Sequence, residues 1–432
     1  MLSKEYYRTY VQILKDELVP AMGCTEPIAI AYAGAVARKI LGALPERVEV
    51  AVSRNIIKNV KSVVVPHTGG LRGIEAAAAA GIVAGDAAKE LEVISHVEQE
   101  DIEAMGTFLK EVPCSVCEAS SDLIFDIQIT LYHGEDNASV RITDFHTNLV
   151  HVSRNGEILL AKEITGKEES ALADKSTLTI EKIFAFAKEV DLADVREVLE
   201  RQVRYNMAIA EEGLRGNYGA NIGKVLLATY GDQDVKVRAK AMAAAGSDAR
   251  MNGCELPVVI NSGSGNQGMT VSLPVITYAE EWEVSRAKLY RSLVVSNLVA
   301  IHQKYYIGSL SAYCGAVSAA CGAGAGITYM YGGTYQQVSL TIINTLGNVG
   351  GIVCDGAKPS CAAKIASSVD AALMAFHMSI QNKSFLPGEG IIRGDVEETI
   401  KSMGYIGRVG MKPTDTEILN IMIDRVNVDQ DC

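Results

Sequence analysis

The sequence predicts an α+β protein with a mainly helical domain and a small inserted α+β domain of three or four antiparallel strands. Long amphipathic segments with helical spacing fill much of residues 170–310. Residues 92–165 differ, because apolar and polar residues alternate there in short runs that are typical of half-buried strands. We therefore expect residues 1–90 and 170–432 to form the helical domain and residues 91–169 to be the inserted domain.

Composition limits the classes of protein that are compatible with the chain. Its 432 residues are enough for two or three domains. The net charge of −12 disfavours nucleic-acid binding, which needs a basic surface. No uncharged apolar run reaches the roughly 18 residues of a membrane span, and the charged N-terminus does not resemble a secretory signal. We therefore expect a cytoplasmic protein in which some of the nine cysteines have metal-binding or catalytic roles. The sequence leaves open whether the protein forms a homo-oligomer.

The N-terminal segment places a cysteine where a helix begins. Residues 3–19 have the pattern of an amphipathic helix, and a second helix follows Pro27. Thr25 could cap this second helix. Cys24 stands just before it, and a thiol at a helix N-terminus is expected to have a lowered pKa. Cys24 is therefore a candidate base or metal ligand, and the alternative is a capping turn in which the cysteine has no role.

Polar residues that could bind a small substrate follow in two groups. The first group comes after a predicted strand at residues 47–53, and the second lies in a glycine-rich turn at residues 66–70. A helix that starts at this turn could present backbone N–H groups to a carboxylate. The alternative is an ordinary turn with solvated side chains nearby. The candidates are Asn55, Lys58, Asn59, Thr68 and Gly69.

The inserted domain contains a CxxC pair, Cys114 and Cys117. A zinc site of this kind needs a second pair, which the domain lacks. A redox CxxC usually opens a helix, whereas this one enters a predicted strand. These cysteines are therefore expected to be structural.

A second glycine-rich loop is expected to bind an anion. Short polar side chains and many backbone N–H groups can surround a carboxylate or phosphate as a nest. The loop lacks the lysine of a Walker motif. The alternative is a flexible linker, but apolar runs on both sides favour a loop held in the core. Its residues are Asn261, Ser262, Gly263, Ser264, Gly265, Asn266 and Gln267.

Three cysteines in a stretch rich in Gly, Ala and Ser are candidate ligands of an iron–sulfur cluster: Cys314, Cys354 and Cys361. Cysteine thiolates are the usual ligands of such clusters, and glycine lets backbone approach closely. Three protein ligands would leave one iron of a 4Fe-4S cluster open, as a catalytic zinc site keeps one position open. The alternative is that these are small buried core residues. A fourth ligand could be Cys24 or Cys432.

Six motifs together resemble the L-cysteine desulfidase family, which is related to the iron–sulfur L-serine dehydratases that use no pyridoxal phosphate. The motifs are MGCTEP (22–27), NIIKN (55–59), HTNLVH (146–151), SDARMNG (247–253), NSGSGNQG (261–268) and VCDGAKPSC (353–361). The resemblance implies a 4Fe-4S cluster on Cys314, Cys354 and Cys361, no pyridoxal phosphate, and conversion of L-cysteine to pyruvate, ammonia and sulfide. It also implies that Cys24 is a base or a resting ligand of the open iron. In related dehydratases a C-terminal cysteine takes that position, as Cys432 could here.

The implied reaction is an α,β-elimination, in which Cys24 or Lys58 would remove the Cα proton. Residues Asn55, Asn59 and Thr68 and the loop 261–267 would hold the substrate's carboxylate and amine. One alternative is an L-serine dehydratase on the same scaffold, with water as leaving group. Another is an iron–sulfur or small-molecule sensor without turnover.

Overall fold

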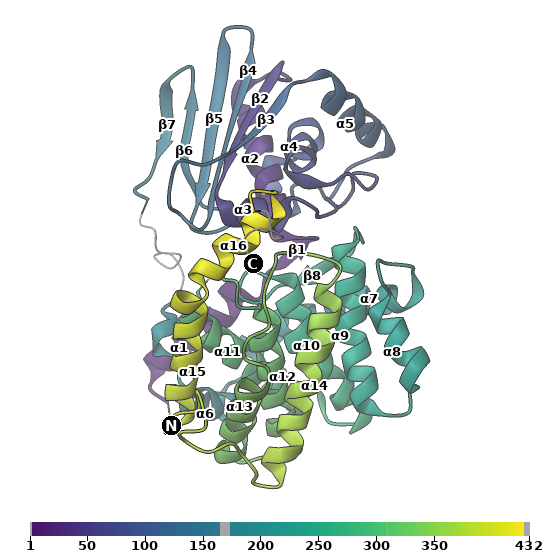
Figure 1. The fold of residues 1–432 in the computed structure, drawn as a ribbon, viewed down its shortest axis with the longest axis vertical. Helices are drawn as coiled ribbons and strands as arrows, with labels where there is room; N and C mark the ends of the chain where they lie inside the picture. Colours follow the sequence, from purple (N-terminus) through teal and green to yellow (C-terminus); the bar gives the residue numbers. More distant parts are fainter. Residues whose placement is uncertain (1, 165–172, 309, 427–432) are drawn as a thin grey trace.

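The computed structural model describes residues 2–164, 173–308 and 310–426 and contains two lobes, one helical and one α+β (Figure 1). The helical lobe is the larger and contains both the first and the last helices. The predicted class, a mainly helical α+β fold, is confirmed. None of the described helices is long and apolar enough to cross a membrane.

The helical lobe is packed around α12 (Gly315–Tyr331), which is buried along nearly its whole length. Glycines allow its close contacts, since a Cβ on Gly322 would lie 2.4 Å from the Ser296 carbonyl oxygen. The short strands β1 (Pro20–Met22) and β8 (Pro257–Val259) pair on the side that faces the other lobe. The other elements of this lobe are α1 (Lys4–Glu17), η2 (Lys175–Thr177), α6 (Ile180–Glu189), η3 (Leu192–Asp194), α7 (Arg196–Arg215), α8 (Ile222–Tyr230), α9 (Val235–Met251), α10 (Gly265–Glu281), α11 (Arg286–Ile307), α13 (Tyr335–Val349), α14 (Cys361–Ile380), α15 (Val396–Tyr405), η4 (Ile406–Gly410) and α16 (Lys412–Met422).

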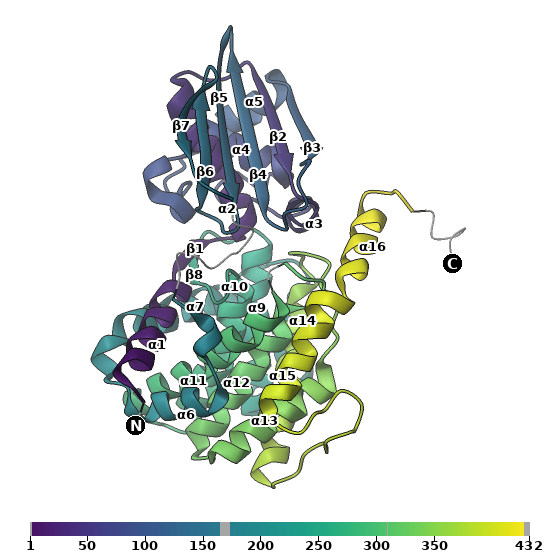
Figure 2. The ribbon, with the colours of Figure 1, turned by 90° about the vertical axis from the view of Figure 1, so that its left-hand side faces the viewer.

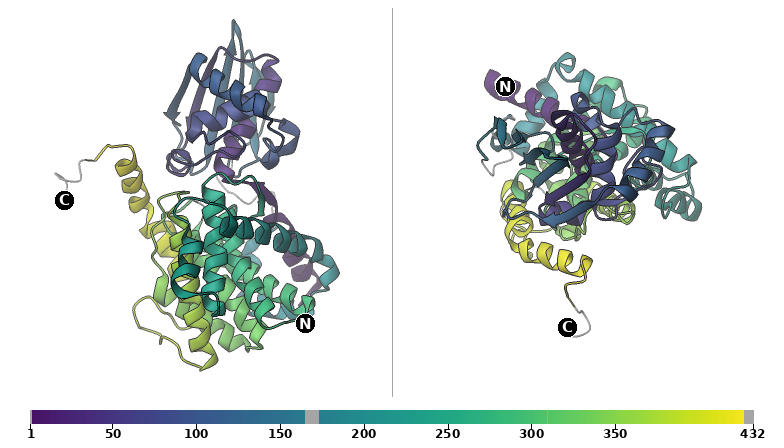
Figure 3. Two further views of the ribbon diagram at one scale, coloured as in Figure 1. Left: turned by 90° about the vertical axis from the view of Figure 1, so that its right-hand side faces the viewer. Right: turned by 90° about the horizontal axis from the view of Figure 1, so that it is seen from above.

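The α+β lobe is a six-stranded sheet with helices on one face. Its strand order is β3-β2-β4-β5-β6-β7, and all neighbours are antiparallel except β2 and β3. Helices α2, α4 and α5 lie behind the sheet in Figure 2 and in front of it in the left view of Figure 3. The elements are α2 (Thr25–Leu41), β2 (Arg47–Val52), α3 (Arg54–Val60), α4 (Gly73–Ala84), η1 (Ala87–Glu92), α5 (Gln99–Glu111), β3 (Cys114–Glu118), β4 (Asp126–His133), β5 (Asp136–Thr143), β6 (Leu149–Arg154) and β7 (Glu157–Ala161).

The inserted lobe begins much earlier in the chain than residue 91, the predicted boundary. Its apolar core runs from Met22 to Val152, whereas α1 packs into the core of the helical lobe. Strand β2 is the physical reason, because it pairs with β3 on one edge and with β4 on the other. The sheet therefore has six strands rather than three or four, since β2 and β3 extend the predicted meander.

Helices α2 and α4 touch through small residues in the middle of α2. A Cβ on Gly81 would lie only 1.8 Å from the carbonyl oxygen of Ala31. A Cβ on Gly34 would lie 3.1 Å from the carbonyl oxygen of Ala78. The alanine-rich sequence of α4 thus serves close helix packing behind the sheet.

A buried ion pair joins the lobes. Lys58 on α3 is 1% exposed, and its ammonium pairs with the carboxylate of Asp415 on α16. Asn55, one turn earlier, donates to the same carboxylate and to the Leu310 carbonyl oxygen at 2.9 Å. Helix α16 thus connects the C-terminal part of the chain to the α+β lobe.

Because α2 and α4 are in close contact at Gly81, we predict that glycine-to-alanine substitutions at Gly81 and at Gly106 change the stability of the protein in opposite directions. Gly81→Ala should destabilise the protein by about 1–3 kcal/mol, because the new methyl group meets backbone that must shift. Gly106→Ala, on α5, meets nothing within 4 Å and should be stabilising by up to about 1 kcal/mol. Urea unfolding followed by circular dichroism measures both changes. Equal effects would contradict the packing described.

The ion pair between the lobes predicts strong coupling between Lys58 and Asp415. Asp415→Asn leaves a buried ammonium without its counter-charge and should cost about 3 kcal/mol. Adding Lys58→Met should recover part of this loss in a double-mutant cycle. The control is Arg425→Gln, which removes an exposed inter-lobe pair with Glu118 and should cost less than about 1 kcal/mol. Additive losses at residues 58 and 415 would argue against the pair.

Candidate functional site

Backbone pairing brings together two cysteines that are forty positions apart. Cys314 is the residue that caps the start of α12, and its N–H donates to the Ile352 carbonyl oxygen at 3.0 Å. The N–H of Cys354 donates to the Ala312 carbonyl oxygen at 2.6 Å. This short antiparallel bridge fixes both cysteines side by side, which their spacing in the sequence does not reveal.

The thiols of Cys314 and Cys354 are themselves in hydrogen-bonding contact. The hydrogen bond from Cys314 lowers the pKa of Cys354 against the effect of burial, and nearby Lys58 lowers it further. The same contact, together with burial, raises the pKa of Cys314. Cys354 is therefore the more acidic thiol of the pair.

Two further cysteines lie beside this pair. Cys361 is the first residue of α14 and is close enough to interact electrostatically with both Cys314 and Cys354. Cys24 belongs to the same small apolar cluster as Cys361. The predicted ligands Cys314, Cys354 and Cys361 thus come together, with Cys24 next to them.

The donor set fits an iron–sulfur cluster better than a single ion. Across the described ranges, no three His, Cys, Asp or Glu side chains are arranged to hold one metal ion. In a 4Fe-4S cluster each cysteine binds a different iron, so its ligands need not share one centre. Cys321, the fourth cysteine of the stretch, is buried within α12 and donates to the Ile342 carbonyl oxygen. Cys432, the other candidate, lies outside the described residues.

Positive charge surrounds the sulfurs. Lys58 and Lys304 interact electrostatically with Cys354, and Lys364 interacts with Cys314 and Cys361. Lys358 is near Cys24, Cys354 and Cys361 and donates to the Lys58 carbonyl oxygen at 3.1 Å. Such cations favour the thiolate forms that ligate metal. The four lysines are Lys58, Lys304, Lys358 and Lys364.

The pKa of Cys24 is shifted in the direction opposite to the one predicted from the sequence. Burial first, and then the nearby carboxylate of Glu26, raise the pKa of Cys24 well above its ordinary value. Its thiol donates to Glu26 Oε2 at 2.9 Å, and Asn59 Nδ2 donates to Glu26 Oε1 at 2.9 Å. Burial and Glu26 therefore outweigh the lowering of the Cys24 pKa that was expected from the helix N-terminus. Cys24 itself occupies the N-cap of α2, and Thr25, the predicted cap, donates instead to the Gly263 carbonyl oxygen.

Glu26 is a buried carboxylate at the centre of these contacts. Burial acts to raise its pKa, but His146, the Cys24 thiol and Arg250 together lower it. Glu26 is thus an ionised group between the two lobes. It lies in the MGCTEP motif, but the prediction emphasised only the cysteine.

Four other candidate residues make structural contacts. Asn55 and Lys58, the latter predicted as a base, form the inter-lobe contact with Asp415, so Lys58 is not a free base. Thr68 donates within its own turn to the Val65 carbonyl oxygen at 2.7 Å. Gly69 packs towards α5, since a Cβ there would lie 2.9 Å from Ile102. Lys58 also lies near Cys354, and Asn59 donates to Glu26 beside Cys24.

Part of the loop 261–267 contacts residues of the site. Asn261 and Ser262 turn away, because Asn261 bonds to Asn297 in the core and the Ser262 N–H donates to Glu17. Ser264 caps α10 by accepting from the Gln267 N–H. Gly263 accepts from Thr25, Gly265 lies against Arg250, and Gln267 lies against Gly315.

Four buried polar atoms in the motifs of the candidate site have no hydrogen-bond partner among the residues that the structure describes. Gln267 lies against Gly315, next to Cys314, and Asn59 lies against Gly356, next to Cys354. Unsatisfied polar atoms are costly in a protein interior and need an explanation such as a ligand. These atoms are Asn59 Oδ1, His146 Nε2, Asn266 Oδ1 and Gln267 Oε1.

Sequence reasoning did not identify two residues at this interface, His146 and Arg250. The His146 ring lies 3.4 Å from the position of a Cβ on Gly263, and burial lowers its pKa. Arg250 is 3% exposed and donates from Nε to the Gly23 carbonyl oxygen at 2.8 Å. Both lie in the motifs HTNLVH and SDARMNG, which were the available signal, but only the fold places them beside Cys24.

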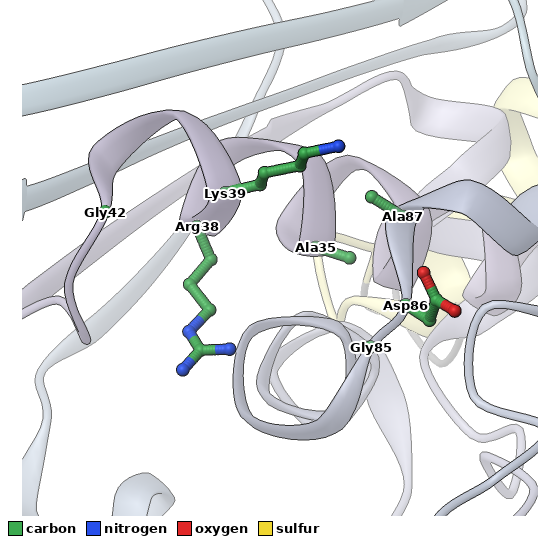
Figure 4. Close-up of a pocket in the computed structure, with 7 residues that line it drawn as sticks. All are labelled: Ala35, Arg38, Lys39, Gly42, Gly85, Asp86 and Ala87. Carbon is green, nitrogen blue, oxygen red and sulfur yellow. The ribbon is translucent and has the colours of Figure 1, made fainter.

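A separate pocket of about 380 Å³ lies at the other end of α2 (Figure 4). It is lined at the helix end by Arg38, Lys39 and Gly42, and on the opposite side by Gly85 and Asp86. With a rise of 1.5 Å per residue, α2 separates Arg38 in this pocket from Cys24 by about 20 Å. The pocket therefore does not belong to the cysteine site.

Comparisons with known proteins show the family of the chain. Residues 88–420 match the family model described as serine dehydratase alpha chain. A UPF0597 protein of Desulfitobacterium hafniense is 57% identical over 420 residues, which cover 97% of both chains. UPF0597 proteins of Lachnoclostridium phytofermentans (53% identical; 97% of this chain, 100% of the relative) and Treponema denticola (46%; 98% and 99%) are also similar. The chain therefore belongs to the serine dehydratase alpha-chain family.

Proposed function

We propose that the protein is an L-cysteine desulfidase that eliminates sulfide from L-cysteine and yields pyruvate and ammonia. The observation that carries this proposal is the meeting of Cys314, Cys354 and Cys361 near four lysines, of which Lys58 is buried. These three residues would hold a 4Fe-4S cluster. When bound, such a cluster with an open iron supplies a Lewis acid, and its soft character suits a thiol leaving group.

The protein groups nearest to the sulfurs are arranged for proton transfer. The Cα proton of an amino acid is weakly acidic, so elimination requires a positioned base. Cys24 is the proposed base, a role in which it acts as a thiolate. The carboxylate of Glu26, 2.9 Å from its sulfur, orients the sulfur, and Arg250 is the nearby charge that favours the thiolate. Lys58 is assigned instead to the inter-lobe ion pair and to charge stabilisation of Cys354.

The unpartnered polar atoms at the interface support an amino acid as the ligand. An α-ammonium group donates up to three hydrogen bonds, and the side-chain oxygens of Asn59, Asn266 and Gln267 are acceptors without partners in the described chain. The first turn of α10 offers N–H groups to a carboxylate. A zwitterion could therefore satisfy groups of both kinds.

The second candidate is an L-serine dehydratase, which the family match favours. The same residues would serve, with water rather than sulfide as the leaving group. Anaerobic protein should be assayed in parallel on L-cysteine and L-serine for pyruvate, and for sulfide with L-cysteine. Faster pyruvate release from L-serine would replace the first proposal by the second. A cluster-containing protein without turnover on either would be a sensor.

We predict that the thiol of Cys354 is required for the cluster to bind. Cys354→Ser should lose the visible absorbance of the cluster and more than about 90% of turnover, because a hydroxyl is a poor ligand for iron in such clusters. Cys117→Ser changes an exposed cysteine on β3 and should retain both. Anaerobic absorbance spectra and iron content measure the outcome. A variant at residue 354 with full iron and full turnover would contradict the assignment.

The proposed base predicts a variant that keeps its cluster and loses turnover. Cys24→Ser should lower kcat by about 100-fold or more, since a positioned base contributes at least that factor. The absorbance spectrum is expected to stay that of the wild type. Full turnover with an intact spectrum would exclude Cys24 as the base.

A further inference from the structure

Arg250 is a buried cation with unused hydrogen-bonding capacity. It lies in the last turn of α9 and is only 3% exposed. A guanidinium stays charged at any ordinary pH, and an unpaired buried charge is costly. Its Nε donates to the Gly23 carbonyl oxygen, but no residue described for this chain forms an ion pair with it or accepts from its two terminal nitrogens.

The nearest buried carboxylate does not serve as its partner. Glu26 is close enough for the charge of Arg250 to lower its pKa. The oxygens of Glu26, however, are already occupied, Oε1 by Asn59 and Oε2 by the Cys24 thiol and the Thr25 hydroxyl. The terminal nitrogens of Arg250 therefore remain available to an anion from outside the chain.

The start of α10 lies directly against this guanidinium. A Cβ on Gly265 would lie 2.4 Å from Arg250 Nε and 2.9 Å from its Cζ, so glycine is required for the contact. The first turn of this 17-residue helix presents backbone N–H groups at the same place. Beside it, Gln267 Oε1 is enclosed without a partner within the described chain, and this residue is 7% exposed. A buried arginine, a helix start and an orphaned amide thus meet at one point.

We propose that Arg250 binds the α-carboxylate of the substrate and so restricts the site to amino acids with a free carboxylate. A guanidinium and a carboxylate form two parallel hydrogen bonds, which fix orientation as well as charge. With the carboxylate on Arg250, the ammonium lies towards Glu26 and Asn59, where charge and acceptors suit it. This inference rests on the proposed function for the reaction but not for the binding step.

Kinetics with two substrates test the proposal. Arg250→Gln should raise KM for L-cysteine by at least about 30-fold, the loss expected when one partner of a buried charge pair is removed. L-cysteinamide, which lacks the carboxylate, should be a poor substrate for the wild type and equally poor for the variant. Arg250→Lys should recover part of the loss. The matched control is Arg201→Gln, another arginine that donates to a backbone carbonyl, that of Leu18, and should leave KM unchanged.

Binding of L-alanine, which has no leaving group, separates this proposal from the proposed function. Calorimetry should show binding to the wild type and a loss of at least about 30-fold with Arg250→Gln, whether or not the protein releases sulfide. If Arg250→Gln does not fold, Arg250→Lys should still weaken L-cysteine about 10-fold and leave L-cysteinamide unchanged. Unchanged KM and L-alanine affinity would overturn the proposal, as would equal losses for both substrates.

Discussion

The burial of positive charge between the two lobes is the constraint on which the site depends. Lys58 and Lys364 have carboxylate partners in Asp415 and Asp355, whereas Arg250 has no such partner among the described residues. Buried cations destabilise a fold unless anions accompany them. Thiolates, the Glu26 carboxylate and an anionic substrate are the groups that can balance this charge. The electrostatics of the interface thus favour a filled site over an empty one.

Helix starts explain why cysteines can meet here. Cys24 and Cys314 cap α2 and α12, and Cys361 begins α14. Each helix start adds partial positive charge, which favours thiolate over thiol. Burial outweighs this effect at Cys24 and Cys361, and contact with Cys354 together with burial outweighs it at Cys314, so the pKa of each of these thiols is raised. Among the four sulfurs only Cys354 has a lowered pKa, and Cys24 differs from the other three in donating to the Glu26 carboxylate.

Local patterns predicted the class of fold and the three clustered cysteines, because these depend on periodicity and on recognisable motifs. The domain boundary could not be predicted, since β2 pairs with strands more than sixty residues later. The sequence predicts Lys58 as a base and Thr68 as a binding residue because it shows residue type but not partners, and both have partners in the structure. Arg250 was not identified because a buried arginine is unusual only when its surroundings are known.

The Lys58–Asp415 pair links the contact between the lobes to the charge around the cysteines. Helix α16 reaches the α+β lobe through this pair. The same ammonium acts on Cys354, whose acidity it increases. Loss of the Asp415 carboxylate would therefore change both the contact between the lobes and the charge around the cysteines. The stability of the interface and the acidity of Cys354 are linked because a single lysine takes part in both.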